Sequence, residues 1–466
     1  MPKTEPIDQA DLENVPFQRD DPGWKQDIIH LIERGDEAEL KASLPDMYAA
    51  DLADLIQDLE TEQGLFALQC LDYEARGDVL HEMEEHVRER YLELLSPGEV
   101  ANIIQAVESD EAHEIINEVP PEKIGEVLSE IPVEDRVSVT ELLSYPEGTA
   151  GAIMAKEFAA VREKETVKSA IKTLRKLSGK VEDIYTVYVL DEDGRYQGHI
   201  DLDKLILSSP RSRIKRLMET ELLAIPVDTD QEEVANYFAR YNFVTAPVVD
   251  PRGFMLGRIT ADDIFDVMQE EATEDILRLG GVSKSETMLT PFWLSSLKRI
   301  AWLSVNLLTA FLSASVVRLF ETTIAQAVIL ASLMPIVAGM GGNAAGQTVA
   351  TVIRNIALGE LPESGFSRAV FREWLFGVMN GISIGLLTGA IVYFIVGIPV
   401  LSAVITTALL FNMMVAALAG ALVPLLLRRF GVDPAIASTI FVTTCTDMMG
   451  FFFFLGLAFL TLPYLK

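Results

Sequence analysis

The sequence predicts a multidomain membrane protein, made of an α-helical solenoid N domain, a duplicated α/β module, a connecting helix and a five-helix transmembrane domain. Its 466 residues leave room for about three domains. Its charged residues are concentrated before residue 291, and long apolar segments follow. The charged part contains an internal repeat of about 60 residues. We expect the domains at residues 1–22, 23–145, 146–262, 263–290 and 291–466.

Charge separates a soluble part from a membrane part. Of 69 acidic and 38 basic residues, only 6 acids and 9 bases fall in residues 291–466. The preceding residues therefore carry a strong negative charge, which repels nucleic acid and attracts cations. We predict no nucleic-acid partner, and a lipid bilayer around residues 291–466.

Residues 1–22 are acidic and lack an apolar core, so we expect a disordered lead rather than a signal peptide. The two cysteines, Cys70 and Cys445, fall in different parts of the chain. They imply no disulfide framework, which favours a cytosolic location for the soluble part.

Residues 23–145 are predicted to form an acidic helical N domain. Apolar residues recur at three- and four-residue steps in DLADLIQDLE and EVANIIQAVE, which is typical of amphipathic helices. Repeated start signals, such as the capping-box pattern from Ser96 to Glu99, divide the domain into short helices. Short helices of this spacing predict a solenoid.

His81 and His86 in HEMEEH resemble the zinc-binding pattern H-E-x-x-H, but they are five residues apart instead of four. On an α-helix the two imidazoles would then point about 140° apart. We therefore exclude a metalloprotease site and expect a solvated, charged face.

Residues 146–262 contain two copies of a strand–helix–strand–strand pattern, each with a D-x-x-G turn joining its last two strands. These turns are typical of hairpins. The run APVVD…G…GRITADDI resembles a tandem CBS pair, a cytosolic regulatory module. The resemblance implies dimerisation and a cleft for regulators. Whether a nucleotide occupies that cleft, or the pair only scaffolds a dimer, stays open.

The connecting segment 263–290 follows as an acidic helix, which we expect from Asp262 to Leu279 before Gly280 and Gly281. Asp263 and Asp266 lie one turn apart, as do Glu271 and Glu274. Like charges at this spacing destabilise a helix by a few tenths of a kcal/mol per pair. A divalent cation would relieve that repulsion, although solvated charge is the alternative.

Five apolar segments are long enough to cross about 30 Å of hydrocarbon. We place them near residues 293–318, 322–354, 368–396, 401–427 and 434–463. Seven basic residues fall on the side of the N-terminal domains and two on the other. By the positive-inside rule the N-terminal domains are cytoplasmic and the C-terminus lies outside.

The second apolar segment carries Pro335, three glycines and the amides Asn343 and Gln347. Pro and Gly are tolerated at membrane depth where neighbouring helices or a wet cavity satisfy the backbone. Amide carbonyls suit hard cations such as Mg²⁺. The stretch predicts a pore wall, with a tight helix interface of small residues as the alternative.

Asp447 is the acid within the fifth segment. A charge near the bilayer centre costs roughly 2.5–3.5 kcal/mol, so such a residue is usually functional. Threonines around it, including Thr443, add further oxygens. Two copies facing each other across a dimer axis would hold a hydrated dication, and Mg²⁺ accepts one or two carboxylates with retained waters. The alternative is a hydrogen bond to a neighbouring helix.

The acidic helical domain, the CBS pair, the acidic connecting helix and the motifs GMGGNAAGQ, GVDPA and TTCTDMMG together resemble the MgtE family of magnesium channels. The resemblance implies a homodimer with its pore on the two-fold axis, and the following residues in two kinds of metal site. The pore would use Asp447, the backbone carbonyl of Thr443, Asn343 and Asp433. Regulatory sites would use Asp263, Asp266, Glu271, Glu274, Asp110 and Glu111.

The resemblance further implies passive Mg²⁺ uptake through the inner membrane, shut by cytosolic Mg²⁺ that holds the connecting helix as a plug. One departure is Asn242 in YNF, where the family can carry an acid, so one regulatory site is expected to be weaker or rebuilt. Transport of another divalent cation such as Mn²⁺ or Co²⁺, or of another ion, stays open. An aspartyl intramembrane protease would need a second deep aspartate, and Asp433 lies at the rim, so we predict no enzyme.

Overall fold

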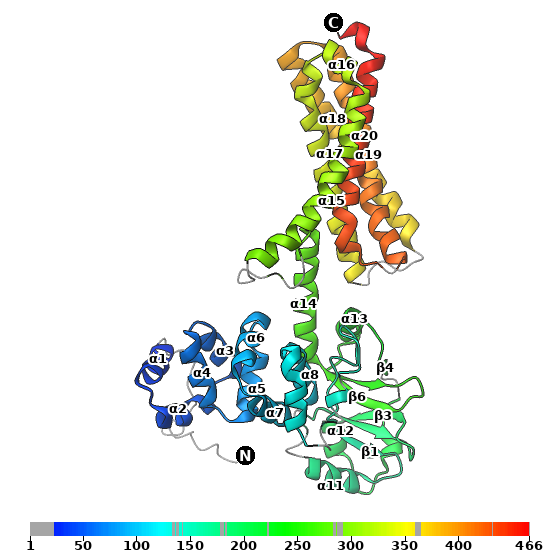
Figure 1. Cartoon of the computed structure of the whole chain (residues 1–466). Helices are drawn as coiled ribbons and strands as arrows, with labels where there is room; N and C mark the ends of the chain where they lie inside the picture. Colours follow the sequence, from blue (N-terminus) through cyan, green and yellow to red (C-terminus); the bar gives the residue numbers. More distant parts are fainter. Residues whose placement is uncertain are drawn as a thin grey trace, which may run out of the picture. The chain divides into compact units, whose positions relative to one another are not determined.

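The computed structural model describes residues 23–465 except 133–135, 137, 138, 142, 178–180, 182, 183, 221, 222, 283–285, 287–291, 359–364 and 431. The predicted disordered lead, residues 1–22, lies outside the described residues. The chain divides into two compact units, residues 1–267 and 268–466 (Figure 1).

Among the residues that the structure describes, the first unit begins with nine short α-helices, which confirm the predicted solenoid. They are α1 (Trp24–Arg34), α2 (Glu37–Ser43), α3 (Ala49–Gln57), α4 (Thr61–Gln69), α5 (Tyr73–His81), α6 (Glu85–Leu94), α7 (Pro97–Ala106), α8 (Ser109–Glu118) and α9 (Pro121–Glu130), with the 3-10 turn η2 (Leu44–Asp46) after α2. Their apolar faces meet in one core that includes the fully buried Leu40, Leu68 and Ile103. The capping box predicted at Ser96 and Glu99 is present at the start of α7.

Two three-stranded sheets follow, one for each copy of the repeat. The first copy contains β1 (Ala160–Arg162), α11 (Val167–Leu177), β2 (Thr186–Leu190), β3 (Tyr196–Asp201), α12 (Leu202–Leu207) and η3 (Ile214–Arg216). The second contains β4 (Ile225–Pro226), α13 (Gln231–Tyr241), β5 (Thr245–Val249) and β6 (Met255–Thr260). In both sheets the first strand pairs parallel with the second and the second antiparallel with the third.

The two D-x-x-G turns form as predicted, and one mechanism explains both. Asp191 accepts hydrogen bonds from the backbone N–H groups of residues 193 and 195, and Asp250 accepts from those of residues 252 and 254. Gly194 and Gly253 have φ values of 97° and 84°, which glycine adopts without strain. The copies are joined by a buried hydrogen bond of 2.6 Å between the hydroxyls of Tyr188 and Thr245.

The connecting helix α14 runs from Ala261 to Leu279, starting in the first unit and ending in the second. Gly281 follows it in a left-handed conformation with φ of 71°, which agrees with the predicted stop at this glycine pair.

The second unit contains five helices that are long and apolar enough to span a membrane, among the residues that the structure describes. They are α15 (Phe292–Leu319), α17 (Ile329–Ala357), α18 (Phe366–Val396), α19 (Pro399–Arg429) and α20 (Pro434–Leu460). The short α16 (Glu321–Gln326) precedes α17, and η5 (Leu462–Tyr464) ends the chain. The prediction of one continuous second span from residue 322 was therefore wrong, because the helix breaks at Ala327 and Val328.

Glycines on α18 allow it to lie directly against α19. Gly377, Gly381, Gly385 and Gly389 recur every four residues and are all buried. A methyl group added at Gly385 would lie 2.8 Å from the backbone oxygen of Thr406, and one at Gly377 would lie 2.8 Å from that of Met413. The α18–α19 pair is thus a small-residue interface of the kind that membrane helices favour.

Candidate functional site

The Asp447 carboxylate lies in the middle of α20 and is half-buried within the second unit. Among the described residues, no hydrogen bond or ion pair with a neighbouring helix engages it. One residue away, the hydroxyl of the fully buried Thr446 donates a 2.9 Å hydrogen bond to the backbone oxygen of Thr443. Within α20 the same carbonyl also accepts the helical backbone hydrogen bond from residue 447, so both of its lone pairs are engaged, and its role as a pore ligand stays a prediction.

The glycines of α17 have different surroundings. Gly341 is buried against α19, whereas a methyl group added at Gly342 or Gly346 would meet no atom within 4 Å. Asn343 lies on an exposed part of the helix. Gly341 is therefore a packing contact, as the tight-interface interpretation predicts, whereas Gly342 and Gly346 border a face that this chain leaves uncovered. The pore wall stays a prediction.

Asn412 of α19 is the buried polar residue that sequence reasoning missed. It is fully buried, and its side-chain nitrogen donates a 2.9 Å hydrogen bond to the backbone oxygen of Val337 on α17. A methyl group at Gly341 would lie 2.2 Å from that nitrogen, and one at Gly450 on α20 would lie 2.7 Å from it. Asn412 therefore joins three helices one turn from Asp447. A single amide inside the apolar run LLFNMMVAAL was the available signal.

Asp433, at the start of α20, is neutralised by an arginine. Arg278 of α14 forms ion pairs with Asp433 and with Glu274. The hydroxyl of Thr439 donates to the backbone oxygen of Leu279 at 3.4 Å. The last turn of α14 thus contacts the first turns of α20, and Glu274 is in an ion pair. Sequence reasoning did not identify this role of Arg278.

In the first unit the structure brings together two predicted regulatory residues, Asp110 of α8 and Asp263 of α14. Burial and repulsion from Asp263 raise the pKa of Asp110 well above its usual range. Burial likewise raises the pKa of Asp263 to about 6, against hydrogen bonds from the Thr260 backbone and hydroxyl. Both side chains keep some solvent exposure, so the surrounding protein removes only part of their hydration.

Asp266, one turn after Asp263, interacts with different groups. Partial burial has the largest effect and raises the pKa of Asp266. The charge of His81 lowers this pKa, and the charge of Glu114 raises it. His81 contacts Glu114 at 2.6 Å. Burial disfavours its charge, but the Glu114 carboxylate outweighs this and raises the pKa of His81 to about 10. The predicted solvated, charged face is confirmed for Glu82, Glu84 and Glu85, which are exposed, whereas the His81 and His86 side chains are only 30% and 18% exposed.

Glu111 lies beside Asp110 in the first turn of α8, and its charge acts on both Asp110 and His81. Glu271 lies on α14 and its charge raises the pKa of Asp275, behind the larger effect of burial. Within the described part of the chain, no group of three or more His, Cys, Asp or Glu side chains is arranged to hold a metal ion. A cation at the acidic residues would therefore need water ligands, as Mg²⁺ accepts.

Comparison with known proteins identifies the family. Residues 334–457 match the MgtE divalent cation transporter family, residues 47–148 match the MgtE intracellular N domain, and residues 150–209 and 214–270 match CBS domains. A magnesium transporter MgtE of Thermus thermophilus is 33% identical over 93% of this chain and 98% of that protein. The chain belongs to the MgtE family of divalent cation transporters.

Other relatives agree with this assignment. A magnesium transporter MgtE of Bacillus subtilis is 29% identical over 92% of this MgtE chain and 96% of its own length. The solved cytosolic domain of an Mg²⁺ channel MgtE in complex with ATP is 31% identical, with a TM-score of 0.50, and covers 52% of this chain and 99% of that one. A solved soluble part of a magnesium transporter is 27% identical, with a TM-score of 0.50, over 53% of this chain and 98% of that one.

Family membership confirms the predicted resemblance, the multidomain fold class and the conclusion that the chain is no enzyme. It also makes the N domain intracellular. Because α15, α17, α18, α19 and α20 are membrane helices, the protein is an integral membrane transporter.

Replacing Gly341 by alanine is predicted to destabilise the membrane unit by about 1–3 kcal/mol, because the added methyl group overlaps Asn412. Gly342→Ala is the matched control, since its methyl group has free space and should change stability by less than about 0.5 kcal/mol. Thermal unfolding of the full chain in detergent, followed by circular dichroism, measures both. Equal unfolding midpoints for the two variants would contradict the close contact.

Asp263→Asn is predicted to stabilise the metal-free cytosolic part above pH 6. The raised pKa of Asp263 means that the folded protein holds a proton longer than the unfolded chain, so stability falls as pH rises from about 4 to 6. Allowing for solvent screening, we expect Asp263→Asn to raise the free energy of unfolding above pH 6 by about 1 kcal/mol. Thermal unfolding of residues 1–281 against pH measures this, with the exposed Asp193→Asn as control. A wild-type midpoint that does not fall over that pH range would refute the prediction.

Proposed function

We propose that this chain transports Mg²⁺ into the cell through the inner membrane, as a homodimer whose pore lies between the protomers. The observation that carries the proposal is the Asp447 carboxylate, which is half-buried at membrane depth and has no partner from a neighbouring helix among the described residues. Relatives named as magnesium transporters over nearly the whole chain support Mg²⁺ as the substrate.

The chemistry of Asp447 suits a hydrated dication. Two carboxylates about 8 Å apart across a dimer axis repel each other by roughly 2 kcal/mol at an effective dielectric near 20. A dication between them removes that repulsion without shedding all its water. We further propose that Thr443 and Asn343, both of which are exposed, contribute oxygens to the ion. Inward movement of a double charge gains roughly 4.6 kcal/mol per 100 mV, so the proposed transport is passive.

We propose that α14 is the plug that closes this pore when cytosolic Mg²⁺ is plentiful. The ion pair between Arg278 and Asp433 supports this, because it joins the end of α14 to the start of the helix that carries Asp447. Mg²⁺ at Asp110 and Asp263, assisted by Glu111 and Asp266, would relieve repulsion between the N domain and the start of α14. Glu271 and Glu274 would add binding further along α14.

The CBS cleft is proposed to bind a nucleotide as a second regulator. The solved cytosolic domain of a related Mg²⁺ channel was obtained in complex with ATP. In this chain the two CBS copies are joined through Tyr188 and Thr245, so a ligand between them would act on both copies at once.

Asp447→Asn should lower Mg²⁺ uptake by about 30-fold or more, because the paired charges contribute roughly 2 kcal/mol to holding the cation. The measurement is Mg²⁺ influx into liposomes that contain the purified protein, with a panel of Mn²⁺, Co²⁺ and Ca²⁺ as competitors. Glu321→Gln, which neutralises the acid at the start of α16, is the control. Wild-type flux through the Asp447 variant would remove this residue from the pore.

Arg278→Gln should weaken inhibition by internal Mg²⁺, because it releases α14 from Asp433. The substitution removes the ion pairs with both Asp433 and Glu274. Loss of the partly exposed pair with Asp433 is expected to cost about 1 kcal/mol, which raises the inhibitory Mg²⁺ concentration about fivefold. The assay is flux at varied internal Mg²⁺. Arg299→Gln, which breaks the ion pair with Glu286 instead, should leave inhibition unchanged. Identical inhibition curves for the two variants would show that Arg278 does not hold the gate.

A further inference from the structure

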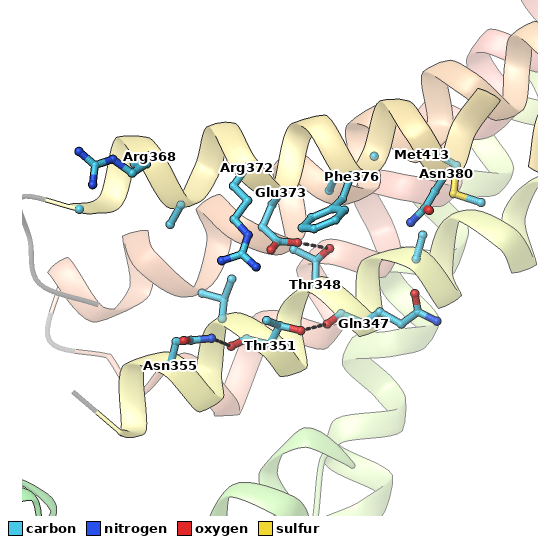
Figure 2. Close-up of a pocket in the computed structure, with 16 residues that line it drawn as sticks. Gln347, Thr348, Thr351, Asn355, Arg368, Arg372, Glu373, Phe376, Asn380 and Met413 are labelled. Carbon is cyan, nitrogen blue, oxygen red and sulfur yellow. Dashed lines mark hydrogen bonds between the residues drawn. The ribbon is translucent and has the colours of Figure 1, made fainter. Parts of the chain in front are cut away.

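A pocket of about 610 Å³ opens between α17, α18 and α19. Asp447 is not among its lining residues, although Gln347 of the predicted pore wall is. The pocket lies where α17 ends and α18 begins, and Figure 2 shows side chains of these two helices facing each other across it. Its wall contains basic, acidic and amide side chains together with apolar ones. The residues that matter here are Asn355, Arg368, Arg372, Glu373, Phe376 and Met413.

Two arginines stand at the outer part of the pocket. Arg368 and Arg372 are one turn apart on α18, near the loop end of that helix (Figure 2). The Arg372 guanidinium lies 5.7 Å from the ring centre of Phe376. No acidic side chain among the described residues forms an ion pair with either arginine. The pocket therefore presents two cations that lack a protein counter-ion in the described part of the chain.

Glu373 supplies one anion deeper in the same pocket. It extends from α18 toward α17, where the Thr348 hydroxyl donates to it at 3.3 Å (Figure 2). Deeper in the pocket Phe376, Met413 and Ala417 line the wall together with the amide of Asn380. The pocket thus combines two guanidinium groups and one carboxylate with a partly apolar floor.

The depth of the pocket in the bilayer follows from the topology. The N domain is intracellular, α15 crosses the membrane outward, and α17 returns, so the α17–α18 turn lies at the cytosolic leaflet. Basic pockets between membrane helices on this side bind phospholipid headgroups. The planar fork of a guanidinium group matches a phosphate in both geometry and charge.

We propose that this pocket binds an aminophospholipid of the cytosolic leaflet. The phosphate contacts Arg368 and Arg372, the primary ammonium contacts Glu373, and an acyl chain lies along Phe376 and Met413. Glu373 distinguishes this ligand from an anionic lipid, because a phosphate alone would be repelled by the carboxylate. Glu373 also distinguishes an aminophospholipid from phosphatidylcholine, because the quaternary amine of phosphatidylcholine has no N–H to donate to the carboxylate.

The test uses the full chain in detergent and native mass spectrometry with added phosphatidylethanolamine, phosphatidylglycerol or phosphatidylcholine. We expect phosphatidylethanolamine to bind the wild type best. The double variant Arg368→Gln, Arg372→Gln should bind phosphatidylethanolamine about tenfold more weakly than the matched control does. That control is the double variant Arg428→Gln, Arg429→Gln at the end of α19. Glu373→Gln should remove the preference over phosphatidylcholine while phosphatidylglycerol binding persists or rises.

A pocket-filling variant, Ala369→Phe, separates a pocket from general surface attraction, because it keeps both arginines and occupies the space beside them. It should reduce binding as strongly as the arginine variant does. Equal binding of the three lipids, unchanged binding in Ala369→Phe, or equal losses in the two arginine pairs would each overturn the proposal. Displacement of the lipid by free glycerophosphate would also overturn it, in favour of a soluble phosphate compound.

Discussion

The close contact around Asn412 is the constraint on which the membrane unit depends. Its buried amide lies between Gly341 of α17 and Gly450 of α20, and no larger residue at either glycine leaves room for it. An amide hydrogen bond to a backbone oxygen inside a bilayer has no competing water. The contact therefore determines how closely α17, α19 and α20 approach, and with it the surroundings of Asp447 one turn away.

Features that depend on neighbouring residues in the sequence were predictable. The capping box at Ser96, the D-x-x-G turns at Asp191 and Asp250, and the acidic helix α14 each arise from side chains acting on backbone within a few residues. The five membrane helices follow from the length of apolar runs. Asn242 has a local role that the sequence analysis did not predict: its left-handed φ of 54° ends α13, and asparagine tolerates that conformation better than most residues.

Features that depend on distant residues were not predictable from one sequence. Nothing near Asp433 indicates Arg278, which lies far earlier in the chain, and nothing near Glu373 indicates Thr348. The apolar pattern also continues through Ala327 and Val328, so a hydropathy argument could not locate the break before α17. Asp447 was identifiable because a charge inside an apolar run is rare for a local, energetic reason.

The two groups of candidate regulatory carboxylates differ in their counter-charge, and this difference assigns them different roles in the proposed gate. Glu274 already has Arg278, so a cation arriving there must compete with a guanidinium. Asp110 and Asp263 repel each other, and both have raised pKa values, so a cation there relieves repulsion instead. A gate that moves from 1:99 to 99:1 needs about 5.5 kcal/mol of differential binding. Sites where carboxylates repel each other in the absence of metal contribute most directly to this differential binding. This favours the N-domain end of α14 as the sensor of Mg²⁺. The Arg278 end of α14 then holds the gate closed.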